Sequence, residues 1–150
     1  MATSLGRTWV KTTVVAADVP SSLAFADVFV IYAQSGATDP ELLALGNSWA
    51  TALSDFVQAA KTIVVLEGAY PNAGTYQIVQ QANLFHATGR TEVTGQTLVV
   101  ARPGDAIATR VPQTYRGERS TVWFSTMDQP VVVQVATDAG IQPVVIHLVF

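Results

Sequence analysis

The stretch Thr62-Ile-Val-Val-Leu-Glu-Gly-Ala-Tyr70 decides our expectation for the fold, because it is typical of a buried strand that runs into a tight turn. In α/β hydrolytic folds a turn of this kind, between a strand and a helix, presents the nucleophile. Here the turn offers Glu67, Gly68 and Ala69, with no serine or cysteine among them. The stretch therefore predicts an α/β fold and also argues against the chemistry that such a turn usually carries.

The residues before this turn predict two strands joined by a helix. Asp27 opens a continuous apolar run to Ala33, which suits a strand buried on both faces. In Asp39-Pro40-Glu41 the aspartate is a good N-cap, and proline fits the first helical position, so we expect a helix from there to about Ala60. Strands joined through a helix pair in parallel, with a right-handed crossover. A further strand rich in valine and threonine is expected over Trp9–Ala17.

The second half of the chain begins with a short predicted helix, from Tyr76 to about Ala82, with Thr75 as its cap. After residue 84 the pattern changes to short strands. Glycines and prolines then separate four segments of strand-like composition, namely Gln96–Ala101, Thr121–Ser125, Pro130–Ala136 and Pro143–Phe150. Short turn sequences separate the last three, which favours antiparallel hairpins or a meander.

Several of these segments together resemble a known family. The run Ala26–Gly68, followed by Gly95–Asp105, Val111–Tyr115 and Pro143–His147, is similar in order and spacing to class I glutamine amidotransferase-like domains, the flavodoxin-like superfamily that includes the ThuA-like proteins. The resemblance covers residues 8–150. It implies a single α/β domain over residues 1–150, with three layers, a mostly parallel central sheet and additional antiparallel strands in the C-terminal half.

The chain departs from that family at the residues that carry its chemistry. Catalytic members have a glycine-flanked cysteine at the turn and a His-x-Glu pair near the C-terminus. This chain has no cysteine, and Val149 stands two residues after His147. The resemblance therefore implies no catalytic residue here, and we expect no cofactor.

A second departure concerns the start of the domain. Family members begin with a strand and a helix ahead of the segment that resembles Trp9–Ala17, so we expect the domain to be incomplete at its N-terminus. Three solutions stay open: the first strand shifts inward, another chain donates a strand, or the sequence is a fragment of a longer protein. The second solution predicts a homo-oligomer or a partner chain that completes the sheet.

Composition excludes several classes of partner. Hydrophobic residues make up 49% of the chain and charged residues only 13%, with a net charge of −3. Nucleic acids and anionic membranes require clustered cations, which this sequence lacks, so we expect neither as a partner. No apolar run has the length of a signal peptide or a bilayer span, and the sequence predicts a soluble domain without indicating a compartment.

A candidate ligand site comprises Gln34, Glu67, Tyr70 and Asn72. Gln34 follows the first apolar strand and the other three follow the second, so a parallel sheet would place all four on one rim, where open α/β sheets bind ligands. Burial of Glu67 would raise its pKa and favour acid–base chemistry. The alternative is structural: a carboxylate that bonds local amides, with turn residues around it.

The two histidines predict no metal site. His86 and His147 are far apart in sequence, and no Asp/His cluster has the spacing of metal ligands. We expect His147 to be a hydrogen-bonded histidine and His86 to lie in a loop.

Two functions of different classes follow from these patterns. The first is a non-catalytic amidotransferase-like module that acts through protein association or self-assembly, favoured by the low charge and high apolar content. The second is a small-molecule-binding domain or weak hydrolase that uses the rim around Glu67.

Overall fold

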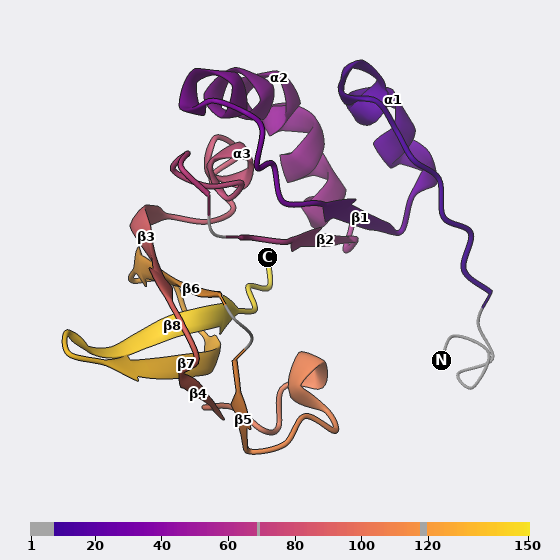
Figure 1. The fold of residues 1–150 in the computed structure, drawn as a ribbon. Coiled ribbons are helices and arrows are strands. Elements are labelled where there is room, and N and C mark those ends of the chain that lie inside the picture. Colours follow the sequence, from indigo (N-terminus) through magenta and orange to yellow (C-terminus); the bar gives the residue numbers. More distant parts are fainter. Residues whose placement is uncertain (1–7, 69, 118–119) are drawn as a thin grey trace.

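A computed structural model of the chain describes residues 8–68, 70–117 and 120–150. A helical part lies above a part made of strands (Figure 1). The helical part contains β1 (Val28–Ile31), α2 (Asp39–Gln58), β2 (Thr62–Val65), α3 (Gln77–Gln80), and the short turns η2 (Ala16–Asp18), α1 (Val19–Ser22) and η3 (Leu23–Phe25). The strand part contains β3 (Ala87–Val93), β4 (Thr97–Val100), η4 (Ala106–Ala108), β5 (Thr114–Arg116), β6 (Thr121–Thr126), β7 (Val131–Thr137) and β8 (Gly140–Ile146).

The expected three-layer flavodoxin-like fold with a mostly parallel central sheet is wrong. Among the described residues, parallel pairing is limited to the two strands β1 and β2, and the other sheets are antiparallel: β3 with β6, and the order β5-β4-β7-β8. The physical reason is that this part of the chain completes one strand–helix–strand crossover and no second one. After α3 the chain enters β3, which pairs with β6 instead of extending the parallel pair.

The crossover itself is confirmed. Helix α2 joins β1 to β2, and the strands pair in parallel with Val30 opposite Val64. The N-cap of α2 is Thr38, one residue before the predicted Asp39. Thr38 and Glu41 form a capping box, in which the Glu41 carboxylate accepts from the Thr38 amide at 2.7 Å. Among the described residues no helix is both long enough and apolar enough to cross a membrane.

The predicted strand over Trp9–Ala17 does not form. Residues 8–15 have no regular secondary structure, and Trp9 is 61% exposed. A strand needs a partner for its backbone groups, and no described strand pairs with this segment.

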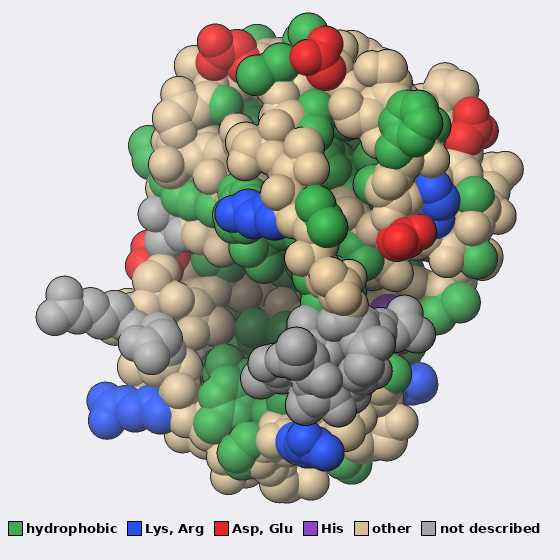
Figure 2. All heavy atoms as spheres, turned by 90° about the vertical axis from the view of Figure 1, so that its right-hand side faces the viewer, with side chains coloured by type: hydrophobic (Ala, Val, Ile, Leu, Met, Phe, Trp, Pro, Cys, Tyr) green, Lys and Arg blue, Asp and Glu red, His purple; other side chains and the backbone are tan. Residues whose placement is uncertain are grey.

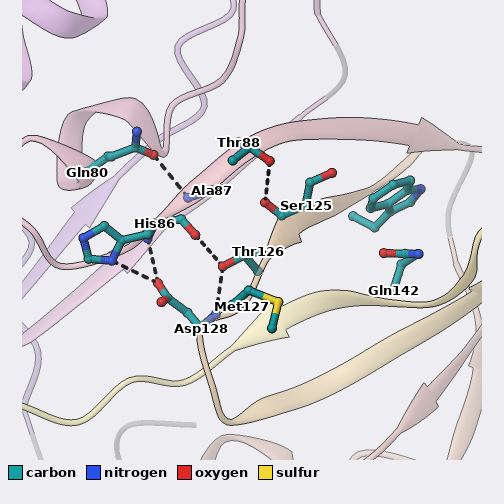
Figure 3. A pocket seen from close by; sticks show the side chains of 10 residues that line it. Gln80, His86, Ala87, Thr88, Ser125, Thr126, Met127, Asp128 and Gln142 are labelled. Carbon is teal, nitrogen blue, oxygen red and sulfur yellow. Dashed lines mark hydrogen bonds and ion pairs between the residues drawn. The ribbon is translucent and has the colours of Figure 1, made fainter.

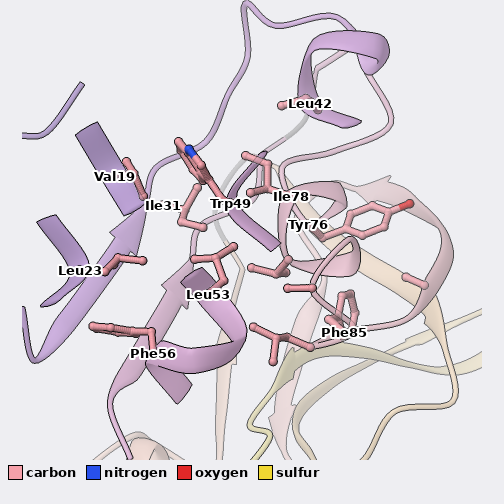
Figure 4. Packing of buried hydrophobic residues seen from close by; sticks show 14 of the residues in the cluster. Val19, Leu23, Ile31, Leu42, Trp49, Leu53, Phe56, Tyr76, Ile78 and Phe85 are labelled. Atoms are coloured by element: carbon pink, nitrogen blue, oxygen red, sulfur yellow. The ribbon is translucent and has the colours of Figure 1, made fainter. Parts of the chain in front are cut away.

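Two apolar clusters support the two parts. The first contains α2, α3 and β1, with Leu42, Leu53 and Ile78 fully buried (Figure 4). The second lies in the antiparallel sheet and is centred on Val100, Val132 and Val135. An aromatic group of Tyr76, Phe85 and Phe124 joins α3 to β6 with ring centroids 5.3–5.9 Å apart.

Gly46 sets the distance between α2 and α3. A Cβ at this position would lie 2.9 Å from the Ile78 carbonyl oxygen and 2.7 Å from Gln81 Cγ. We expect Gly46→Val to lower the free energy of unfolding by about 1–3 kcal/mol, because overpacking outweighs the better helix propensity. Ala44→Val, on the exposed side of the same helix, is the matched control in urea unfolding. Equal stability of the two variants would contradict this packing.

Candidate functional site

The four predicted site residues lie together in the structure, but their polar groups bond to the protein. The Asn72 amide donates to the main-chain oxygens of Gln34 and Ala37, at 2.8 Å each. The Tyr70 hydroxyl is 3.1 Å from Thr75 Oγ1, which accepts from the Gln34 amide at 2.9 Å. Gln34 contributes main-chain atoms, and its side chain bonds locally to the Tyr32 oxygen at 2.7 Å.

Arg90, at the middle of β3, organises this loop. Its guanidinium donates to main-chain oxygens around the loop that follows β2, and these belong to Gly68, Tyr70, Asn72 and Ala73. The guanidinium carbon also lies 4.8 Å from the centre of the Tyr70 ring. The role of Arg90 could not be predicted from the sequence, because a contact with carbonyl oxygens depends on the path of the loop and not on the type of residue.

Glu67 is the buried acid beside this guanidinium. Its Oε1 accepts from the Thr75 amide at 2.6 Å, and its Oε2 is 3.6 Å from Arg90 Nε. The side chains of Glu67 and Arg90 are only 8% and 7% exposed. Gly74 has a φ of +129°, and a Cβ there would lie 2.3 Å from Glu67 Oε2, so only glycine fits. Glu67 therefore has the surroundings expected under the structural alternative, in which its carboxylate accepts a hydrogen bond from a local amide.

Burial raises the pKa of Glu67, and this outweighs the hydrogen bonds from Thr75 and the charge of Arg90, which lower it. Among the described residues, Glu67 Oε2 and Asn72 Oδ1 are buried side-chain oxygens without a hydrogen-bond partner. Both facts indicate that the burial of this acid is unfavourable, and the low exposure of Glu67 shows that the loop after β2 encloses it.

The raised pKa of Glu67 predicts a specific pH dependence. The folded chain keeps this proton at pH values where the unfolded chain has lost it, so the contribution of Glu67 to stability falls as the pH rises from 4.5 through the folded pKa. We expect Glu67→Gln to gain stability relative to the parent chain over that interval. Urea unfolding of both proteins at a series of pH values measures it, and a difference that does not change with pH would refute the prediction.

A separate cleft of about 650 Å³ lies where β3 begins and β6 ends (Figure 3). The main-chain amide of His86 donates to Asp128 Oδ2 at 2.6 Å, and the imidazole Nδ1 is 3.6 Å from the same oxygen. The Thr126 hydroxyl donates to the His86 carbonyl oxygen and accepts from the Asp128 amide. These bonds tie the start of β3 to the end of β6, so the groups facing the cleft mainly serve to join the strands.

His147 is hydrogen-bonded, as predicted. Its Nδ1 lies 2.9 and 3.0 Å from the two carboxylate oxygens of Asp105, and its amide donates to the Pro130 oxygen. The hydrogen bond from His147 holds the pKa of Asp105 below its ordinary value. The pair fixes the chain after β8 against the loop that follows β4.

The described residues include no group of three or more His, Cys, Asp or Glu side chains that would hold a metal ion. No protein-family model, curated protein or solved structure matches this chain.

Proposed function

We propose that this chain is a non-catalytic α/β module that acts through self-association, in which a second copy completes the β1–β2 sheet. The observation that carries the proposal is the state of this parallel pair: among the described residues no strand pairs with either outer edge, and Val30 and Val64 on the face away from α2 are exposed. Parallel sheets occur almost always with both faces covered.

Helix α2 covers only one face of the pair. Phe29 packs edge-on against Trp49 of α2, with ring centroids 6.0 Å apart, and Ile31 is buried against the same helix. On the opposite face Val30 and Val64 lie side by side and are 37% and 38% exposed. Leu66 and Tyr32 continue this exposed apolar face at the ends of the strands.

Figure 2 shows apolar side chains around a hollow between the helical part and the strands below it, with a Lys or Arg side chain at its upper border. With a net charge of −3, the chain has little electrostatic repulsion between copies.

The rim around Glu67 gives less support to a small-molecule binder or weak hydrolase. The polar groups expected to meet a ligand bond to main-chain atoms of the loop instead, and Glu67 is enclosed. The resemblance to amidotransferase-like domains remains a proposal for residues 26–68, supported by the β1–α2–β2 crossover.

The mass of the protein in solution tests self-association. We expect the chain to be a dimer or larger by light scattering, and Val30→Lys to shift it toward monomer, because a charge would be buried in the interface. Leu43→Lys is the matched control, since Leu43 is equally exposed, at 38%, but lies on α2. A parent chain that is monomeric at all concentrations, or equal effects of the two variants, would refute the proposal.

A further inference from the structure

We infer that the extended segment Trp9–Val15 of one copy adds as a strand to the outer edge of β1 in a second copy. This inference rests on the proposed function and names the occupant of the open edge. The exchange is reciprocal: each copy donates its segment and accepts that of the other, as in a two-fold symmetric dimer.

The donor segment has the composition of a strand but no strand partner. It reads Trp-Val-Lys-Thr-Thr-Val-Val, in which every residue except Lys11 is β-branched or aromatic. Among the described residues, the single main-chain bond to it runs from the Asp18 amide to the Val15 oxygen. Val10 is 87% exposed. Unpaired backbone with such side chains is a template for strand addition.

The acceptor edge follows from the hydrogen bonds between β1 and β2. The Thr62 amide donates to the Asp27 oxygen at 3.1 Å, and the Leu66 amide donates to the Ile31 oxygen at 2.9 Å. Backbone groups of successive residues in a strand point to opposite sides. Val28 and Val30 therefore direct their amides and carbonyls away from β2, to an edge that pairs with no described strand.

Within one copy the segment lies near β1 without pairing with it. The Trp49 indole donates to the Ala16 oxygen at 3.0 Å, and the Lys11 ammonium lies 5.5 Å from the centre of the Tyr32 ring. The contact of Lys11 places the segment beside the end of β1, and Val14 is partly buried against the first apolar cluster, but no main-chain hydrogen bond pairs the segment with β1. The segment of a second copy is not connected to η2 of the copy that accepts it, so it is able to approach the edge in register.

Addition of this strand also brings apolar side chains against Val30 on the exposed face of β1. Side chains of a strand alternate between the two faces of a sheet. The segment has two apolar side chains for each face: Val10 and Val14 on one, Trp9 and Val15 on the other. Either orientation places apolar side chains beside Val30 of β1.

Proline at position 13 tests the donor. The Thr13 amide makes no main-chain bond within one copy, so Thr13→Pro is expected to leave the monomer folded and as stable as the parent chain. We place the amide of Thr13 on the side of the donated strand that faces β1, so that proline removes a ladder donor in the dimer, and we expect the dissociation constant to rise at least about tenfold. Thr13→Val, which keeps the amide, is the matched control and is expected to dimerise like the parent chain.

Mixing two variants tests the exchange itself. Thr13→Pro copies accept but do not donate, whereas Val30→Pro copies, which lack the outward amide on an edge strand, donate but do not accept. We expect each variant to be monomeric alone and the mixture to form a heterodimer, detected by native mass spectrometry. Absence of the heterodimer overturns the inference. Unchanged dimerisation of Thr13→Pro together with its loss in Val30→Lys overturns it too, but leaves the proposed function standing. A monomeric parent chain overturns both.

Discussion

Replacement of Arg90 by alanine is expected to lower the free energy of unfolding by about 3–5 kcal/mol, a large share of the stability of a domain of this size. The guanidinium bonds to four main-chain oxygens of the loop after β2 and lies 3.6 Å from the buried Glu67 carboxylate. Its removal leaves a buried charge without a counter-ion and several carbonyls without donors. Urea unfolding near neutral pH measures the loss.

Two further variants define the role of Arg90. Arg90→Lys keeps the charge but loses the planar set of donors, so its stability is expected to lie between that of Arg90→Ala and the parent chain. Arg102→Ala is the control, because Arg102 is exposed and its substitution is expected to change stability by no more than about 0.5 kcal/mol. If Arg90→Ala were as stable as this control, the loop would not depend on the guanidinium.

Replacement of Leu53 by alanine is expected to cost about 2–5 kcal/mol, through lost apolar burial and the cavity left behind. Leu53 is fully buried on α2, near Ile31, Trp49 and Phe56 in the first apolar cluster (Figure 4). Leu43→Ala on the exposed side of α2 is the control, with an expected loss below about 1 kcal/mol. Thermal or urea unfolding compares them, and equal losses would mean that α2 packs through another face.

The elements that local patterns define could be predicted from the sequence. The helix α2 follows from its N-terminal signals and apolar spacing, and the bounds of β1, β2, β4, β6 and β7 lie within two residues of those predicted. The strand β3 was missed, because Ala-Thr-Gly-Arg-Thr-Glu-Val has little apolar character and the strand depends on pairing with β6, about thirty residues later. The strand predicted over Trp9–Ala17 from its valine- and threonine-rich composition is wrong, because no described strand pairs with this segment.

The sequence predicted that the four candidate site residues lie close together, but it did not predict what their polar groups bind. Gln34, Glu67, Tyr70 and Asn72 meet because two parallel strands end at the same edge of the sheet. That their polar groups bond to the loop could not be predicted, since the loop is held by Arg90 from a strand in a different sheet. The buried acid Glu67 thus contacts groups of the loop after β2, through the Thr75 amide, and the guanidinium of Arg90.

Amide hydrogen exchange in β1 distinguishes a free edge from one that a second copy covers. The amides of Phe29 and Ile31 face β2, whereas the amides of Val28 and Val30 face the open edge. We expect the amides of Phe29 and Ile31 to be protected at every protein concentration, and those of Val28 and Val30 to become protected only as the concentration rises and copies associate. Fast exchange at Val28 and Val30 at all concentrations, in a protein whose mass shows association, would contradict it.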